Sequence, residues 1–191
     1  NLCMQFASYH SSKVKQCIGS VIQDMTLELE SDGLTSLFSK NVSKSVSNDN
    51  TTSKQLTIAW CSSDIAYHPV SRFLYSFFAA TTNCLKHKHL VVDTYNHQSE
   101  SSCQMFKDLP NLEYVDLGKQ DIKTKISALR EREIDIALDL SGWTGGNFQN
   151  GFLTRFADIQ INYLGYFAST GNPSMDFWPG DQILFPTAMK E

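Results

Sequence analysis

The feature that most constrains the fold is a regular alternation of apolar runs and amphipathic segments from Leu56 onward. Five short runs rich in aliphatic and aromatic residues are typical of buried strands, at 56–61, 89–95, 112–117, 134–140 and 159–164. Between them lie segments with the apolar spacing of helices, at 70–82, 99–107, 119–132 and 147–156. This order predicts a Rossmann-like α/β fold, a parallel sheet with helices on both faces.

Two further regions precede this lobe. Residues 1–40 are predicted as a helical segment, because Val14, Ile18, Val21 and Met25 recur three and four positions apart and would share one face. Residues 41–55 consist mainly of Ser, Thr, Asn and Lys and are predicted as a flexible linker. The α/β lobe then occupies residues 56–191.

The composition argues against several classes of protein. The chain has 191 residues, of which 41% are hydrophobic, and its net charge of −4 without a basic stripe argues against a nucleic-acid partner. No apolar run approaches the roughly 20 residues of a membrane span, and the first residues lack the pattern of a signal peptide. Five cysteines without a CxxC pair argue against disulfides and a structural metal, and favour buried thiols in the cytoplasm. Because the sequence begins at Asn1 rather than Met, we expect it to be part of a longer chain.

The loop after the first predicted strand brings a carboxylate and an imidazole together. Asp64 and His68 are four residues apart, and Pro69 disfavours helix at His68, so the imidazole stays in the loop. In a parallel sheet such loops share the edge where ligands bind. The pair suits general acid–base chemistry. An equally simple interpretation is a surface loop in which Asp64 caps the following turn.

Two other loops at the same edge are rich in glycine and hydroxyl residues, at 141–147 and 165–171. Such loops let backbone N–H groups approach a ligand closely. Neither matches a dinucleotide or phosphate-loop motif, so spacing predicts no nucleotide cofactor. Any one of these loops is explained by the need to reverse the chain direction. The two of them together with the Asp64–His68 loop, all at one edge of the sheet, favour a ligand-binding site.

Several other polar residues are assigned structural roles. Asp135 and Asp139 share one face of a predicted strand, and we expect Asp139 to bind the backbone of the next loop rather than to serve in acid–base chemistry. His87, His89 and His97 lack metal-ligand spacing and are interpreted as surface histidines. The segment 176–181 is predicted as a packed connection to a last short strand near 182–185.

Three segments resemble one known family. Residues 134–147 resemble the D-I-L-x-D-L-x-G-x-T-x-G-N segment of bacterial O-GlcNAc-transferase-like proteins, the Spindly-type members of glycosyltransferase family 41. Residues 159–171 resemble that family's P-x-Q-x-x-W-L-G-Y-P-G-T-[ST]-G, and residues 58–69 resemble its G-Y-x-S-x-D-F-x-x-H-P. The three motifs occur in the family's order and cover residues 56 to about 186.

The resemblance implies the N-terminal catalytic lobe of a two-lobed GT-B glycosyltransferase. Residues 1–40 would then link the lobe to upstream tetratricopeptide repeats. The family uses no cofactor beyond its donor, a UDP-sugar that is typically UDP-GlcNAc and is bound mainly by the C-terminal lobe. The acceptor is a Ser or Thr hydroxyl of a protein, and the anomeric configuration is inverted in one displacement.

The resemblance also assigns site residues by position. Asp64 and His68 match the active-site residues, and either of them could be the base. The residues expected to border the substrate are Tyr67, Pro69, Val70, Leu164, Gly165 and Thr170.

The sequence also departs from the family pattern. The family's Pro-Gly pair is Phe167-Ala168 here, Arg72 replaces a second histidine, Tyr163 replaces the usual Trp, and Trp143 stands where His is common. The sequence stops at Glu191, before the lobe that binds the diphosphate, so we expect these residues alone to be inactive. A second hypothesis is therefore a non-catalytic scaffold module attached to tetratricopeptide repeats. A third hypothesis, an unrelated α/β hydrolase or nucleotide-binding protein, is ranked last because the sequence contains no signature motif of either class.

Overall fold

A computed structural model describes residues 12–31, 55–95 and 101–180 of the chain. The strand predicted near 182–185 and nearly all of the linker predicted at 41–55 lie outside these residues, as does His97. Within the predicted helical segment, the structure describes one helix, α2 (Ser12–Ser31).

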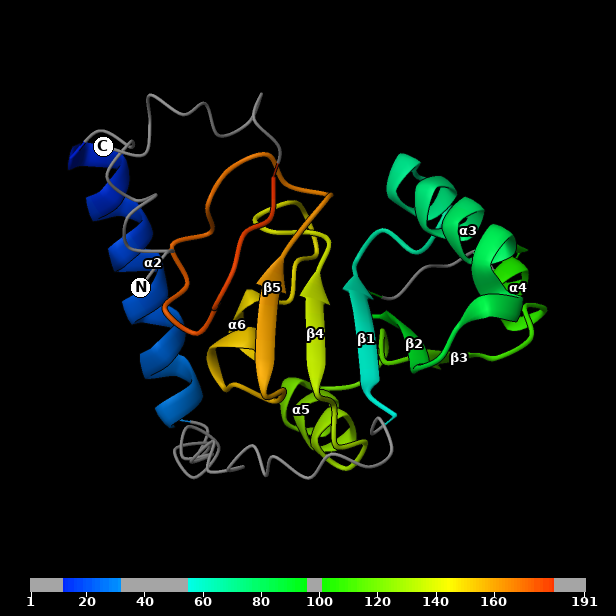
Figure 1. The fold of residues 1–191 in the computed structure, drawn as a ribbon. Coiled ribbons are helices and arrows are strands. Elements are labelled where there is room, and N and C mark those ends of the chain that lie inside the picture. The colour runs from blue at the N-terminus through cyan, green and yellow to red at the C-terminus, as the bar shows by residue number, and fades with distance from the viewer. Residues whose placement is uncertain (1–11, 32–54, 96–100, 181–191) are drawn as a thin grey trace, which may run out of the picture.

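The described lobe is built on a five-stranded parallel sheet (Figure 1). Its strands run in the spatial order β3-β2-β1-β4-β5, and every neighbouring pair is parallel. Their bounds are β1 (Thr57–Ser62), β2 (Lys88–Asp93), β3 (Leu112–Asp116), β4 (Ile136–Asp139) and β5 (Ile159–Asn162). All five predicted strands are confirmed, with most of the apolar runs extending one or two residues beyond the paired residues.

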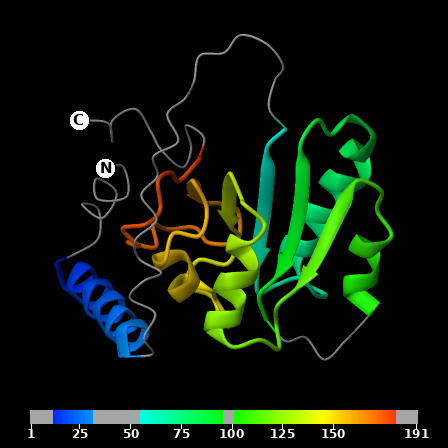
Figure 2. The ribbon, with the colours of Figure 1, turned by 90° about the horizontal axis from the view of Figure 1, so that it is seen from below.

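Helices cover both faces of the sheet, as predicted (Figure 2). Each predicted helix is present, although most are shorter than their apolar spacing indicated. Their bounds are α3 (Pro69–Thr81), α4 (Ser101–Lys107), α5 (Ile122–Arg130) and α6 (Gln149–Leu153), with a short 3-10 helix η3 (Thr82–Cys84) after α3. Helices α3 and α4 cover one face, and α5 and α6 cover the other. Helix α2 packs on the outside of α6, where Leu29 contacts Leu153.

A hydrophobic core lies on each face of the sheet, between the strands and the helices, because successive side chains of a strand point to opposite faces. In β1, Ala59 and Cys61 enter the core shared with α5 and α6, while Trp60 packs in the core shared with α3 and α4. The Trp60 Nε1–H donates to Nδ1 of His89, 3.1 Å away. His89 is therefore a buried residue of β2, which corrects its interpretation as a surface histidine. Burial, and then the nearby His87, lower the pKa of His89.

The strand order places a topological switch point between β1 and β4. The chain leaves β1 toward β2 on one side, and β4 is added later on the other side. In open parallel sheets, ligands bind at the carboxyl ends of the strands beside this point. The loops after β1 and β4 flank it, and the loop after β5 follows next.

The described residues contain neither a candidate membrane span nor a candidate metal site. No helix in the described ranges has the length and apolar content needed to cross a membrane. Within the same ranges, no group of His, Cys, Asp and Glu side chains is arranged to hold a metal ion.

Candidate active site

The loops after β1 and β4 are joined by three buried serine hydroxyls. Ser141 Oγ lies 3.2 Å from Ser62 Oγ and 2.9 Å from Ser63 Oγ, and it accepts the Ser63 N–H at 2.8 Å. The Ser63 hydroxyl also donates to the Gly145 carbonyl. These bonds hold the loops after β1 and β4 together at the switch point of the sheet.

The side chain of His68 caps the N-terminus of helix α3. Its Nδ1 accepts the Val70 N–H at 3.3 Å, and Pro69 occupies the first helical turn. The cap of α3 is therefore His68 and not Asp64. Because Nδ1 is an acceptor, the proton of the neutral ring is on Nε2.

Asp64 lies beside this imidazole without a hydrogen bond to it. Asp64 Oδ2 is 3.9 Å from His68 Nδ1, beyond hydrogen-bond distance, and this buried oxygen has no hydrogen-bond partner among the residues that the structure describes. The Asp64 backbone is fixed by Ser71, whose hydroxyl donates to the Asp64 carbonyl. The two side chains are thus brought together, and the imidazole is half exposed.

Asp139 organises the loop after β4. Its carboxylate accepts the Ser141 and Gly142 N–H groups at 3.0 and 3.1 Å, and Gln149 Nε2–H at 2.5 Å. This confirms the expected role in binding the next loop. Asp135 marks the start of β4, where it accepts the Thr57 N–H at 2.8 Å.

The Asp139 carboxyl is completely buried between the sheet and α6. Burial raises its pKa to about 6, although the three N–H donors act in the opposite direction. Burial, and then the charge of Asp139, raise the pKa of the neighbouring Cys61 thiol far above its usual range.

We expect Asp139 to make the stability of the lobe depend on pH. Its pKa is about 6 in the folded chain and near 3.8 when exposed, so its contribution is greatest below pH 4 and is lost as pH rises through 6. The wild type should lose about 1–3 kcal/mol of unfolding free energy relative to Asp139→Asn between pH 4 and pH 7.

Chemical denaturation of both proteins across this pH range measures the effect. The substitution also places a side-chain N–H group opposite the Gln149 Nε2–H group. The loss of stability from these two facing donors is the same at every pH. The change in the difference is therefore the informative quantity, and a constant difference would contradict the raised pKa.

The loop after β5 packs closely on the loop after β4. A Cβ on Gly165 would lie 1.6 Å from the Leu140 carbonyl oxygen and 3.3 Å from the Val70 side chain. A Cβ on Gly142, whose φ is +54°, would lie 2.3 Å from the Tyr166 ring. Trp143 Nε1–H also donates to the Thr170 carbonyl at 2.7 Å. Glycine is therefore required where the two loops meet.

The residues expected to border the substrate occupy different environments. Val70 and Gly165 pack together below the edge, and Leu164, with φ +61°, is exposed beside them. Tyr67 is 87% exposed, and its ring lies 4.4 Å from the Arg72 guanidinium. Thr170 is only 1% exposed, and its hydroxyl accepts the Asn172 N–H, so in this structure it supports the loop.

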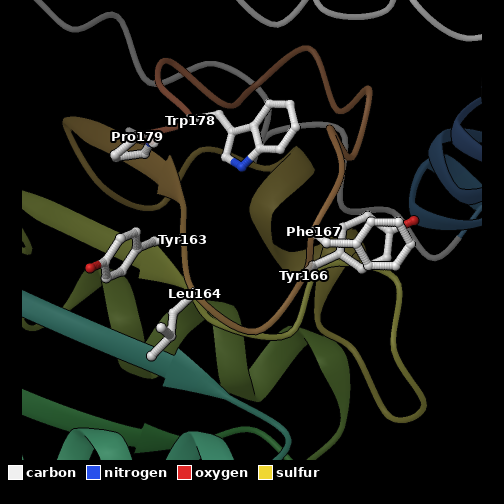
Figure 3. A pocket seen from close by; sticks show the side chains of 7 residues that line it. Tyr163, Leu164, Tyr166, Phe167, Trp178 and Pro179 are labelled. Atoms are coloured by element: carbon white, nitrogen blue, oxygen red, sulfur yellow. The ribbon is translucent and has the colours of Figure 1, made fainter. Parts of the chain in front are cut away.

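An aromatic cavity of about 560 Å³ opens beside β5 (Figure 3). It is lined by Tyr163, Leu164, Tyr166, Phe167, Trp178, Pro179 and Gly180. Phe167, which replaces a proline of the family motif, is 83% exposed here. The sequence had indicated only a packed connection at 176–181. The parallel bridge between Phe177 and Ile161 is what returns Trp178 to this edge.

Comparison with known proteins identifies the family. The model of glycosyl transferase family 41 matches residues 20–191. The chain belongs to this family. Its sequence is 26% identical over 141 residues to a probable UDP-N-acetylglucosamine–peptide N-acetylglucosaminyltransferase SPINDLY of Petunia hybrida, covering 72% of this chain. It is 26% identical over 133 residues to the SEC protein of Arabidopsis thaliana, covering 70% of this chain.

A solved structure supports the same assignment. A mutant O-GlcNAc transferase of Thermobaculum terrenum superposes with a TM-score of 0.64 at 25% sequence identity, covering 71% of this chain. The family 41 chain described here spans only 26% of that protein, 15% of the Petunia protein and 13% of the Arabidopsis protein. Its sheet matches the Rossmann-like lobe that the resemblance implied.

Proposed function

We propose that the chain is the N-terminal lobe of an inverting glycosyltransferase that transfers a sugar from a UDP-sugar to Ser or Thr hydroxyls of a protein. The observation that carries the proposal is the meeting of the three family motifs at the switch point of the sheet. The names of the relatives favour N-acetylglucosamine as the sugar.

Asp64 and His68 would supply the acid–base chemistry. For His68 to act as the base, Nε2 must be free to take the acceptor proton, so the ring proton must move to Nδ1. A protonated Nδ1 can no longer accept the Val70 N–H and would instead donate to Asp64 Oδ2, which has no hydrogen-bond partner in the described part of the chain. The present 3.9 Å separation would have to shorten by about 1 Å, a tightening common when substrate binds.

The remaining residues would shape the acceptor side. Tyr67, Pro69 and Val70 are next to His68 in the chain, and Gly165 lies against Val70; together with Leu164 they would border the sugar, while Thr170 would support its loop. The donor diphosphate would be bound by a second lobe, and tetratricopeptide repeats would precede α2. On this proposal the 191 residues transfer no sugar by themselves.

A non-catalytic scaffold module is the second candidate, and the position of Phe167 favours it. This ring projects from the substituted Pro-Gly position, is exposed, and adds a bulky apolar group to the lining of the aromatic cavity, on the opposite side from Leu164 (Figure 3). Under this alternative the edge would bind a peptide without chemistry.

Sugar transfer by the full-length protein tests the proposal directly. We expect transfer from UDP-GlcNAc to Ser- and Thr-containing peptides, detected by mass spectrometry, with a β-linked product from the α-linked donor. The isolated 191-residue chain should give no product. Peptide binding without transfer from any UDP-sugar would reject the proposal in favour of the scaffold.

A further inference from the structure

The side-chain amide of Gln149 connects the loops after β4 and β5. Gln149 begins helix α6, is fully buried and was assigned no role by the sequence motifs. We propose that Gln149 is a positioning residue, which fixes these two loops in the arrangement needed for sugar transfer. The inference rests on the proposed function.

The two ends of the amide bind different partners. The Nε2 group donates to Asp139 Oδ2 at 2.5 Å and to the Gly142 carbonyl at 3.2 Å, both of which belong to the end of β4 and its loop. Oε1 accepts from Asn172 Nδ2 at 3.0 Å, at the end of the loop after β5. One side chain therefore holds both loops through a donor on one side and an acceptor on the other.

Asn172, which binds Gln149, also forms hydrogen bonds within the loop after β5. It is fully buried, its backbone N–H donates to Thr170 Oγ1 at 3.3 Å, and its Oδ1 accepts the Ser174 N–H at 2.9 Å. A displacement of Gln149 would thus release the loop at Thr170 and at Ser174 together.

The connection reaches the residues expected to border the sugar. Gly142, whose carbonyl Gln149 binds, lies directly under the Tyr166 ring. Tyr166 follows Gly165, which is in contact with the Leu140 carbonyl and Val70. Since a misplacement of about 1 Å can lower a rate about 10²-fold, a shift of Gly142 should affect transfer without any contact between Gln149 and substrate.

Gln160 provides a matched control. It is also a fully buried glutamine, and its Nε2 donates to the Phe152 and Ser174 carbonyls at 2.9 and 2.8 Å. Neither of these two bonds involves Asp139 or residues 141–147. Gln149→Met and Gln160→Met each remove two amide donations and preserve similar volume, but only the first disconnects the two loops.

The experiment compares these variants in the full-length protein, below the onset of unfolding of either one. We expect Gln149→Met to lower kcat for transfer from UDP-GlcNAc about 10–100-fold, and Gln160→Met to stay within about threefold of wild type. Amide hydrogen exchange should accelerate in residues 141–146 and 168–172 only in Gln149→Met. Equal losses of kcat in both variants, or no loss in Gln149→Met, would overturn the inference.

A rescue variant separates this role from a general packing effect. Gln149→Glu places two carboxylates face to face and should lower kcat at a pH high enough to ionise both, because neither then supplies the missing proton donor. Adding Asp139→Asn restores a donor, since the new amide at position 139 could donate to the carboxylate introduced at position 149 while still accepting from Ser141 and Gly142. We expect the double variant to recover at least tenfold over Gln149→Glu, and no recovery would count against the direct contact.

Failure of the proposed function would remain distinguishable from failure of this inference. If the wild type transfers no sugar, the proposed function is rejected. Hydrogen exchange then tests separately whether Gln149 holds the loops after β4 and β5 together. Identical exchange in residues 141–146 for Gln149→Met and Gln160→Met would then reject that connection.

Discussion

Replacing His68 with asparagine is expected to lower kcat/KM for sugar transfer by about 10²–10⁴-fold, the usual effect of removing a general acid or base. Asparagine is a good helix N-cap, so it can keep the bond to the Val70 N–H while removing the ring that would carry the proton. The measurement is the transfer rate of the full-length protein at saturating UDP-GlcNAc and varied peptide. His68→Ala removes both the ring and the cap and should also destabilise α3.

His87 offers the control for this substitution. Its Nδ1 also accepts a backbone N–H, that of Leu56 at 3.4 Å, but it lies at the opposite end of the sheet from the loops. His87→Asn should leave the transfer rate within about twofold of wild type. If His68→Asn is equally active, His68 is only a helix cap and the site assignment is wrong.

Asp64→Asn then distinguishes the two members of the pair. If His68 is the base and Asp64 orients it, Asp64→Asn should lose less activity than His68→Asn. The reverse order would identify Asp64 as the base. The unpartnered Asp64 Oδ2 is compatible with either role, so the kinetic order decides between them.

The second large effect is expected on stability, for Gly165→Ala. An added Cβ would overlap the Leu140 carbonyl oxygen, a backbone atom that cannot rotate away, and would press on Val70. The β5 loop or the end of β4 must therefore move, and the unfolding free energy should fall by about 3 kcal/mol or more. Denaturant unfolding of wild type and variant measures the loss.

Gly145→Ala is the matched control in the neighbouring loop. A Cβ there would meet no heavy atom within 4 Å, and the effect should lie within about 0.5 kcal/mol. Equal stability of the two variants would show that the loop after β5 can move away from Leu140 at little cost.

Much of the fold could be predicted because its signals are local. The runs 56–61 and 134–140 contain enough alternating apolar residues to mark β1 and β4, and Pro69 marks the start of α3. Asp139 at the end of the run, followed by Leu-Ser-Gly, was enough to predict a carboxylate that binds the next turn, because that bond spans only two or three residues.

The parts that could not be predicted depend on distant partners. His89 is buried because Trp60 of a neighbouring strand donates to it, and no spacing in the sequence records that pair. Thr170 is buried and its hydroxyl accepts the Asn172 N–H, a bond that its motif position did not indicate. Likewise, Trp178 reaches the aromatic cavity only because Phe177 pairs with Ile161.

The buried serine hydroxyls between β1 and β4 have a consequence for ligand affinity. Ser62, Ser63 and Ser141 hold their loops in one arrangement before any ligand arrives. The backbone there has already lost its conformational entropy during folding, so a ligand that binds at this edge orders few further groups. Weak individual contacts with an extended peptide can then give measurable binding.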